Sequence, residues 1–495
     1  MLLGLLLSVS SVRAQVTLPR ILSDHMVVQR NRPVHVWGMA APNQQVKVAF
    51  RGETESTVAN RLGQWSLYLK PGAAGGPFEM TIDGVAGIGS SGNTVHIADI
   101  LVGDVWLASG QSNMEFEMRR AATADEDLAK ASILNLRLLM VDKKSATYAQ
   151  TDIATPGWQT SSPESARDFS AVAWYFAREI HARERVPVGI IDSTWGGTIV
   201  ESWTRLTAIG EDASLMPLFV SRGEMTDHEA TGLLEEKDEE KQIAEAKAAG
   251  KPIPQFPWHP PLDTWAPGLL WNGMIAPLTP FPVRGVIWYQ GESNSAVARA
   301  PLYSNIFRDM IADWRRAWGI GNFPFLYVQI SNFKSTPLED WAVLREEQLK
   351  TLNVANTAMA VTIDIGNPDD VHPTDKVDVG HRLALAARAL SYGENVVYSG
   401  PLFRQATPEG GAIRAWFNDA EGLMAKDGPV TGFEVAGADK HFVAATARIE
   451  GTTVVASSPQ VPRPVYVRYG WANSPQCNLF NGSGLPASPF TSIPY

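Results

Sequence analysis

The sequence predicts an α/β protein whose doubly wound parallel sheet is flanked by β-rich regions at both ends. Between residues 100 and 393, short apolar runs typical of buried strands alternate with segments of helical composition. The strand-like runs are 105–108, 188–192, 286–289, 325–330 and 359–365, and the helical segments include 168–185 and 377–391. Since ligands of such sheets bind beyond the carboxyl ends of the strands, we expect the functional site there.

The first part of the chain predicts a leader followed by a β domain. Residues 1–14 form an apolar run that ends in Val12-Arg13-Ala14, which predicts a signal peptide cut after Ala14, although no basic residue precedes the run. We therefore expect a secreted or periplasmic protein. Residues 15–99 contain short alternating runs, such as Val46-Lys47-Val48-Ala49-Phe50, between turns rich in Pro, Gly and Asn. This pattern predicts an N-terminal β-sandwich domain.

The α/β region, which we expect to be the catalytic domain over residues 100–393, is interrupted at about 201–265. The interruption contains a charged helical stretch (235–247) and a proline-rich stretch (252–261). We interpret it as an insertion that could cover the site, with a solvated helical arm as the alternative for its charged part. Residues 394–495 return to β-type runs and predict a C-terminal β-rich region.

Composition excludes several classes of protein. The 495 residues carry a net charge of −10, which argues against a large basic surface for nucleic acid. After the leader, no stretch is long and apolar enough to span a membrane. Cys477 is the only cysteine, so we expect no internal disulfide and no cysteine nucleophile. The nine histidines fall into no metal-ligand spacing, and we expect no metal and no cofactor.

A serine lies where the first strand of the α/β region ends. The segment Leu107-Ala108-Ser109-Gly110-Gln111-Ser112-Asn113-Met114 places Ser112 between an apolar strand and a helix-like segment. A tight strand-to-helix turn exposes a serine hydroxyl beside free backbone N–H groups, which is how α/β enzymes present a nucleophile. The alternative is an ordinary turn, since such turns favour Gly, Ser and Asn for conformational reasons.

Three later strand ends carry groups that could serve this serine. His372, in Asp369-Asp370-Val371-His372-Pro373, lies on a loop after the strand-like run 359–365 and could act as a base. Ser193-Thr194-Trp195-Gly196-Gly197 follows the run 188–192, and Gln290-Gly291-Glu292-Ser293-Asn294 follows the run 286–289. The glycine N–H groups and amide side chains of these loops could stabilise an oxyanion.

These motifs resemble those of the sialate O-acetylesterases, a branch of the SGNH (GDSL-like) hydrolases. The resemblance extends from the amino end of the mature chain to its last residues. The matching segments are 21–30 with Val34, Trp37 and Gly38; Gly110-Gln111-Ser112-Asn113-Met114; 288–294; Asp370-Val371-His372-Pro373; 469–473; and 484–490.

The resemblance implies a role for each residue. Ser112 would be the nucleophile and His372 the general base and later the general acid. The oxyanion hole would comprise the N–H groups of Ser112 and Gly197 together with the side-chain amide of Gln290 or Asn294, between which the sequence does not choose. Trp195 and Glu292 are candidates for binding the substrate.

The sequence does not decide which acidic residue orients His372. The superfamily spacing selects Asp369, whose three-residue offset lets a carboxylate fold back onto the ring, and we favour it. The sialate esterase branch more typically selects Asp370. A dyad, in which a backbone carbonyl holds Nδ1–H, is the third possibility.

The resemblance therefore implies a carbohydrate O-acetylesterase that acts through an acetyl-serine, sialate O-acetylesterase-like, with an acetylated sugar as its partner. An acetylesterase acting on plant hemicellulose, xyloglucan or xylan, is the alternative. A lipase or thioesterase and a non-catalytic glycan-binding protein are rivals from other classes. The sequence gives no indication of oligomeric state.

Two sets of side chains bear on the substrate. A sialate site needs an arginine for the sugar carboxylate, and tryptophans can stack on sugar rings. The candidate arginines are Arg119, Arg205 and Arg284, and the candidate tryptophans are Trp195, Trp203, Trp258, Trp265 and Trp271.

Overall fold

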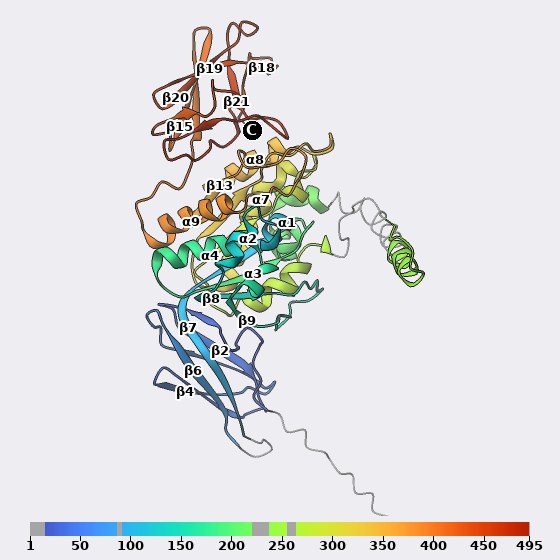
Figure 1. Ribbon diagram of the computed structural model, residues 1–495, viewed down its shortest axis with the longest axis vertical. Coiled ribbons are helices and arrows are strands. Elements are labelled where there is room, and N and C mark those ends of the chain that lie inside the picture. Colours follow the sequence, from blue (N-terminus) through green and yellow to red (C-terminus); the bar gives the residue numbers. More distant parts are fainter. Residues whose placement is uncertain (1–14, 87–91, 220–236, 255–263, 495) are drawn as a thin grey trace, which may run out of the picture.

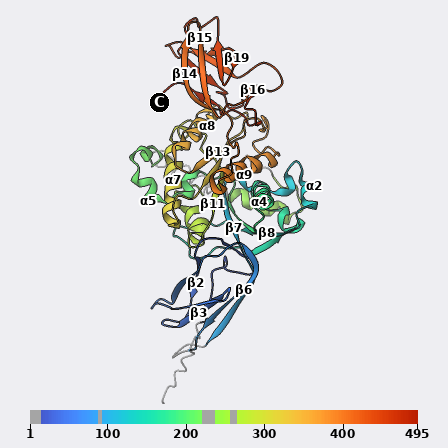
Figure 2. The ribbon, with the colours of Figure 1, turned by 90° about the vertical axis from the view of Figure 1, so that its left-hand side faces the viewer.

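The computed structural model describes residues 15–86, 92–219, 237–254 and 264–494. Three regions follow one another along the long axis of the molecule (Figures 1 and 2): an N-terminal β-rich region, a central α/β region and a C-terminal β-rich region. The expected signal peptide (1–14) and parts of the expected insertion, including Trp258, lie outside the described residues.

The N-terminal region contains two sheets whose buried apolar side chains belong to one core. The antiparallel pair β2 (Val34–Met39) and β5 (Gln64–Leu69) forms one. In the other, β3 (Gln45–Phe50) pairs with β4 (Glu53–Val58) and β6 (Gly75–Gly84), and β6 pairs with β7 (Asn93–Gly110). Alternate residues of β3 and β5 are buried, as the alternating sequence predicts for strands with one face on a core.

Strand β7 belongs to both the N-terminal and the central sheet. Its first half pairs with β6, and its second half pairs with the central strands β10 (Val188–Thr194) and β11 (Gly285–Tyr289). The pairing with β6 shifts register near Asp99, which adopts a φ of 54°. An extra residue of this kind bends a strand, so the expected boundary at 99/100 falls at a bulge inside one continuous strand.

The central sheet has the strand order β13-β12-β11-β7-β10-β8-β9. The strands from β13 to β8 run parallel, and β9 is antiparallel to β8. The other strands of this sheet are β8 (Ile133–Met140), β9 (Trp158–Ser161), β12 (Phe325–Gln329) and β13 (Thr357–Val361). A short strand, β1 (Val27–Gln29), pairs in parallel with β7. The sheet is therefore mixed rather than purely parallel, because β9 follows β8 without the crossover that a parallel neighbour needs.

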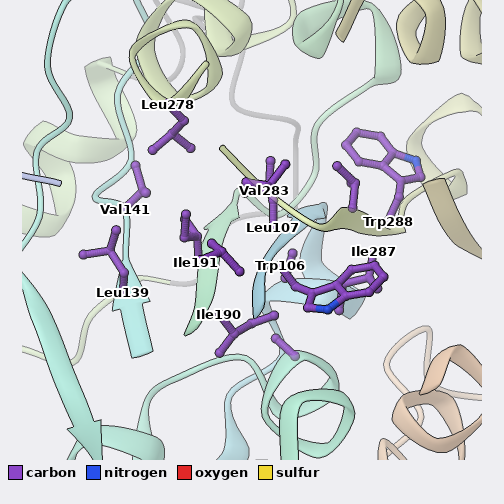
Figure 3. Close-up of a cluster of buried hydrophobic side chains, with 14 of the residues drawn as sticks. Trp106, Leu107, Leu139, Val141, Ile190, Ile191, Leu278, Val283, Ile287 and Trp288 are labelled. Carbon is purple, nitrogen blue, oxygen red and sulfur yellow. The ribbon is translucent and has the colours of Figure 1, made fainter. Parts of the chain in front are cut away.

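Helices cover both faces of this sheet. Trp106 of β7 packs edge-on against Phe176 of α4, whereas Trp288 of β11, on the opposite face, packs against Phe307 of α7. Figure 3 shows apolar side chains of β7, β8, β10 and β11 between these layers. The helices are α1 (Ser112–Glu115), α2 (Ala124–Ala129), α3 (Pro163–Arg167), α4 (Ala171–Glu184), α5 (Leu206–Glu211), α7 (Tyr303–Trp318), α8 (Trp341–Lys350) and α9 (Val377–Tyr392).

Local chemistry sets the ends of the elements. The expected helix 168–185 is α4, which begins after Ser170, whose side chain accepts the N–H of Ala173, and ends at Arg185 in a left-handed conformation. The expected strand 359–365 is wrong at its end, since β13 stops at Val361 and the Thr362 hydroxyl turns back to the carbonyl of Gln329.

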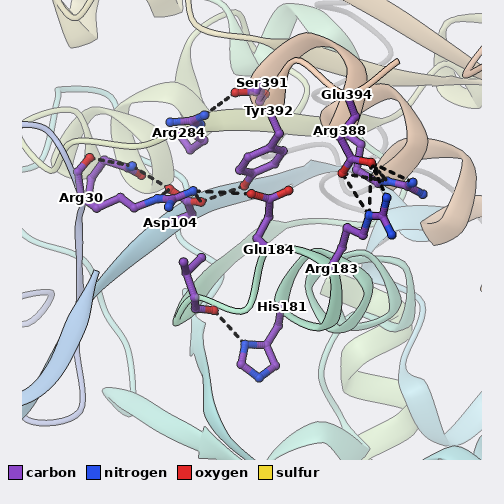
Figure 4. A network of polar contacts seen from close by, with 12 residues as sticks. Arg30, Asp104, His181, Arg183, Glu184, Arg284, Arg388, Ser391, Tyr392 and Glu394 are labelled. Carbon is purple, nitrogen blue, oxygen red and sulfur yellow. Dashed lines mark hydrogen bonds and ion pairs between the residues drawn. The ribbon is translucent and has the colours of Figure 1, made fainter. Parts of the chain in front are cut away.

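A polar network joins the N-terminal segment to the base of the central region (Figure 4). Asp104 of β7 is fully buried and accepts two hydrogen bonds from the Arg30 guanidinium. The side chains of Gln29 and Tyr392 also donate to Asp104. The beginning of the chain, β7 and the end of α9 are thus held together by one buried carboxylate.

The C-terminal region has its own apolar core. One sheet has the order β14-β15-β20-β19 and a second the order β18-β17-β21-β23. Their bounds are β14 (Leu402–Glu409), β15 (Ala412–Asn418), β17 (Phe433–Ala436), β18 (Val443–Ala444), β19 (Thr446–Glu450), β20 (Thr453–Ser457), β21 (Tyr466–Tyr469) and β23 (Phe490–Thr491), with a separate pair β16 (Met424–Ala425) and β22 (Leu479–Phe480).

The parts of the expected insertion that the structure describes differ in burial. Residues 200–204 are buried against the α/β core, whereas the helix over 237–248 is mostly exposed. Among the residues that the structure describes, no helix combines the length and apolarity that a membrane crossing needs.

Candidate active site

Ser112 lies at the carboxyl edge of the central sheet, where β7 ends. Gly110 makes the turn possible, because it has a φ of 136° and a Cβ there would lie 2.2 Å from the carbonyl oxygen of Tyr289. The N–H of Gln111 donates to that same carbonyl, and α1 begins at Ser112. The chain therefore turns sharply and presents Ser112 as the first residue of a helix.

His372 contacts the serine directly. Its Nε2 lies 2.8 Å from Ser112 Oγ, a hydrogen-bond distance. Burial and the nearby ammonium group of Lys376 lower the pKa of His372 below its usual value. The ring is therefore neutral at neutral pH and able to accept the serine proton.

The two candidate aspartates lie in different places. Asp369 is mostly exposed and forms an ion pair with Lys334, so the structure does not bring it to the imidazole. Asp370 accepts a hydrogen bond from the backbone N–H of His372, and its Oδ1 lies 3.9 Å from Nδ1 of the ring. That distance is too long for a hydrogen bond.

The glycine loop that follows β10 lies against the serine turn. The N–H of Trp195 donates to the Gly110 carbonyl, and a Cβ on Gly196 would lie 3.2 Å from Ser112 Cβ. The N–H of Gly196 is bound by the Glu115 carboxylate, whereas no bond from the N–H of Ser112 or Gly197 to the described part of the chain is found. Ser112 and Gly197 both border the cavity over the hydroxyl, so their backbone donors are candidates for binding a ligand there.

The amides of Gln290 and Asn294 point into the protein rather than into the site. Gln290 Nε2 donates to the Thr198 carbonyl and to Asn294 Oδ1, and Asn294 Nδ2 donates to Glu201. Both side chains are buried, and neither borders the cavity at Ser112. Their hydrogen bonds join the loop after β11 to the segment after β10.

Three residues near the serine escaped the sequence reasoning. Gln111 borders the cavity, and its side-chain oxygen accepts the N–H groups of Gly291 and Ser293. Asn113 and Lys376 are both buried and are joined by a hydrogen bond. The positions of Gln111 and Asn113 on either side of Ser112 were the available signal, whereas Lys376 gave none.

The buried network ties the nucleophile turn to the histidine loop. Asn113 Nδ2 donates to Glu292 Oε1 at 2.6 Å and to the carbonyl of Val371 at 2.9 Å. Lys376 Nζ donates to Asn113 Oδ1 at 2.6 Å. Burial raises the pKa of Glu292 and lowers that of Lys376 to about 7. One amide side chain therefore links the neighbours of Ser112 and His372.

A cavity of about 710 Å³ opens over the serine–histidine pair. Its wall is partly aromatic and partly charged, and Trp265, whose indole N–H donates to the Gly197 carbonyl, fixes the glycine loop. The aromatic residues of the wall are Phe116, Trp195, Trp265, Phe333 and Trp341, and the charged ones are Glu115, Glu117, Arg120, Lys143, Glu292 and Glu339. Such a wall suits a ligand with both apolar and hydroxyl-bearing faces.

Several of the candidate substrate contacts do not border this cavity. Trp203 and Trp271 are buried in the core and present no stacking platform. None of the candidate arginines borders the cavity. Arg119 pairs with Glu117 and Asp168, Arg205 pairs with Asp313, and Arg284 donates to the Ser391 carbonyl. The arginine in the wall is Arg120, which lies over the Phe116 ring and which residue order did not distinguish from Arg119.

Comparison with known proteins finds clear relatives. The model of a carbohydrate esterase family, the sialic acid-specific acetylesterases, matches residues 260–389. The sialate O-acetylesterases of Mus musculus and Homo sapiens are each 29% identical to this chain, over 95% of it and over 93% and 91% of their own lengths. The crystal structure of a carbohydrate acetylesterase from Xanthomonas citri, with 38% identity, aligns with a TM-score of 0.83 over 97% of this chain and 100% of that one.

Proposed function

The chain belongs to the sialate O-acetylesterase family of carbohydrate esterases, and we propose from this premise that Ser112 accepts the acetyl group of its substrate. The protein is a carboxylic ester hydrolase that removes O-acetyl groups from sugars. We assign this role to Ser112 because it forms a hydrogen bond with His372 and both residues border a cavity large enough for a sugar.

The geometry supports a two-step reaction. Ser112 Oγ attacks the acetyl carbon while its proton passes to His372 Nε2, and the imidazolium then protonates the sugar oxygen as its bond to the acetyl carbon breaks. Water, deprotonated by the same ring, releases acetate from the acetyl-serine and restores the serine. An alkoxide leaving group is expelled more easily than an amine, which favours ester substrates over amides.

The oxyanion is held, in this proposal, by the backbone N–H groups of Ser112 and Gly197. Their lack of bonds to the described chain and the place of both residues on the cavity wall support this role. Gln290 and Asn294, the candidates for a third donor, act instead on the loops because their amide protons are engaged elsewhere.

We assign the orientation of His372 to Asp370 rather than Asp369. Asp370 lies closer to the ring, and a movement of about 1 Å would bring its carboxylate within reach of Nδ1–H. Catalytic hydrogen bonds commonly tighten when substrate binds. The hydrogen bonds among Lys376, Asn113 and Glu292, with that from Asn113 to the Val371 carbonyl, hold the loop of His372 against the turn of Ser112.

The arrangement of the loops supports the finer assignment to the SGNH hydrolases. The serine follows β7, the glycine loop follows β10, the amide-bearing loop follows β11 and the histidine follows β13. All four meet at the carboxyl edge of the sheet. We also propose that the protein is secreted or periplasmic, for which the apolar run at its start is the support.

The sugar itself is either an O-acetylated sialate or an acetylated hemicellulose. Trp195 and Glu292 border the cavity and support direct roles in binding, although one Glu292 oxygen also holds Asn113. Arg120 is the group that could meet a sialate carboxylate. A neutral hemicellulose would rely on the aromatic wall instead.

The test measures acetate release from 9-O-acetyl sialic acid and from an acetylated xyloglucan oligosaccharide. Ser112→Ala should lower kcat by roughly 10⁴ or more on any substrate that the wild type cleaves. Ser293→Ala, at another serine of the same cavity, is the matched control and should retain activity. Full activity in Ser112→Ala would overturn the assignment, and release from one substrate alone would identify the sugar class.

A further inference from the structure

A second cavity lies between the N-terminal sheet β2–β5 and the central region. Its volume is about 800 Å³, and among the residues that the structure describes it shares no lining residue with the cavity at Ser112. Trp37, Gln64 and Ser66 border it from the sheet, and residues 150–152 and Pro280 border it from the central region. It is therefore a cleft between two parts of the fold, a common place for ligands.

The sheet side of this cleft carries a stack of aromatic rings. His35 lies between Trp37 and Tyr68, with ring centroids 4.8 and 4.4 Å away and nearly parallel planes. His35 Nδ1 is 2.9 Å from the Pro280 carbonyl, and burial lowers its pKa, so the neutral ring donates this hydrogen bond. The stack is thus fixed to the opposite wall, and the cleft is preformed.

Polar groups surround the aromatic wall. On the outer face of β2–β5, Ser66 stands directly across from Trp37, and Gln64 stands across from Met39. Gln150 and Asp152 border the cleft on its other side, where the Gln150 amide is held by the Tyr148 carbonyl and Lys144 and the Asp152 carboxylate accepts the N–H of Arg20. A flat ring edged by amides, hydroxyls and a carboxylate is the chemistry that recognises a sugar, whose ring has apolar faces and a hydroxylated rim.

The same two segments border both cavities. One runs from Lys143, at the catalytic cavity, to Gln150 and Asp152 at the cleft, and the other runs from Trp265 to Pro280. They are joined side by side, since the N–H of Gln150 donates to the Asn272 carbonyl and the N–H of Ala146 to that of Leu269. Gln150 lies seven positions after Lys143, so the Cα atoms of these two lining residues are at most about 25 Å apart.

We propose that the cleft binds distal sugar units of an oligosaccharide whose acetylated residue lies at Ser112. The stack covers one face of the Trp37 indole, and the other face receives a sugar ring while the Gln64 side-chain N–H groups and the Ser66 hydroxyl bind its hydroxyls. This inference rests on the proposed function and narrows its substrate to a chain of sugars rather than a free monosaccharide. Cleavage of the acetyl ester remains the task of Ser112 and His372.

The experiment compares Trp37→Ala with the wild-type full chain on long and short substrates. The long ones are acetylated xyloglucan and xylan oligosaccharides and O-acetylated sialyllactose, and the short ones are 9-O-acetyl sialic acid and 4-nitrophenyl acetate. KM for the preferred oligosaccharide should rise about tenfold with kcat unchanged, because one stacking contact is lost. Both kinetic constants for the short substrates should stay within twofold.

Two further variants serve as a control and as a substitute for Trp37→Ala. Trp416→Ala removes an exposed tryptophan of β15 in the C-terminal region and should change nothing. Gln64→Ala alters an exposed cleft residue without touching the core, and it replaces Trp37→Ala if that variant unfolds at a lower temperature than the wild type.

The outcomes separate the two levels of the proposal. If KM for the oligosaccharide is unchanged in the folded variants, the cleft does not bind distal sugars. The proposal is also wrong if the wild type cleaves no oligosaccharide better than the free sugar. Acetate release that survives in Ser112→Ala would instead overturn the proposed function, whatever happens at Trp37.

Discussion

At the scale of single residues, the charge of Lys376 has a measurable effect on His372. Activity requires the neutral ring, so kcat/KM falls as pH drops through the His372 pKa, which lies below its usual value. Lys376 and Arg120 favour the neutral form, and Asp370 and Glu115 favour the protonated one. Lys376→Met removes a positive charge that opposes protonation, so the acid limb of the profile should move to higher pH, by roughly half a unit to one unit.

The control for Lys376 is Lys334, which pairs with Asp369 on the same loop but does not reach the ring. Lys334→Met should leave the acid limb in place. A limb that stays fixed in Lys376→Met as well would show that this ammonium group does not act on the histidine.

The two aspartates before His372 should respond differently to substitution. Asp370→Asn removes the nearest carboxylate and should lower kcat by about 10- to 100-fold, less than the ~10⁴ of a triad with a closed hydrogen bond. It should also move the acid limb to lower pH, because that carboxylate raises the pKa of His372. Asp369→Asn should remain within about twofold of the wild type, since Asp369 contacts Lys334.

Steady-state kinetics of acetate release against pH decide between the aspartates. A larger loss in Asp369→Asn than in Asp370→Asn would reverse the assignment. Equal, small losses would instead identify the site as a serine–histidine dyad.

At the scale of elements, the turn after β7 depends on Gly110. In Gly110→Ala, the new methyl group would meet the Tyr289 carbonyl at 2.2 Å in a φ that side chains rarely adopt. The turn must shift, so we expect a loss of about 3 kcal/mol or more in the free energy of unfolding, together with misplacement of Ser112. Urea denaturation and kcat measure the two effects.

Gly321→Ala provides the comparison for Gly110. Gly321 has a φ of 86° but open space around a Cβ, so only the backbone conformation is penalised, by about 1 kcal/mol. Equal losses in the two variants would mean that crowding by Tyr289 contributes nothing.

The sequence predicts the elements better than it predicts their contacts. Apolar runs and turn residues indicated the parallel strands and the loops of Ser112 and His372, because burial and backbone conformation act locally. The antiparallel β9 could not be predicted, since pairing joins distant residues. The orientation of Gln290 and Asn294 depends on partners such as Thr198 and Glu201, whose positions only the folded chain defines.

The tryptophans illustrate the same limit. Trp195, Trp203, Trp265 and Trp271 lie close to the motifs in the sequence, yet two border the cavity and two fill the core. The residue type is the same in both roles, because a tryptophan can fill a core or line a cavity equally well. Which face of an element meets solvent is a property of the whole fold.

At the scale of the whole molecule, the shared strand β7 couples two regions that the sequence divides. β7 pairs with β6 in one sheet and with β10 and β11 in the other, and Asp104 within it binds Arg30 and Tyr392. Unfolding either sheet frees half of this strand and exposes a buried ion pair, which is costly. In the part of the chain that the structure describes, the C-terminal sheets have a core of their own and share no strand with the other sheets.

We therefore expect the N-terminal and central regions to lose structure together and the C-terminal region to lose it independently. Hydrogen exchange followed by mass spectrometry at increasing urea concentration should show β3 and β6 losing protection at the same concentration as β10 and β11, and activity should vanish there too. Strands β15 and β20 should follow a transition of their own. If β3 and β6 open at lower urea while activity persists, residues 15–99 form an independent domain and the bulge at Asp99 uncouples the two halves of β7.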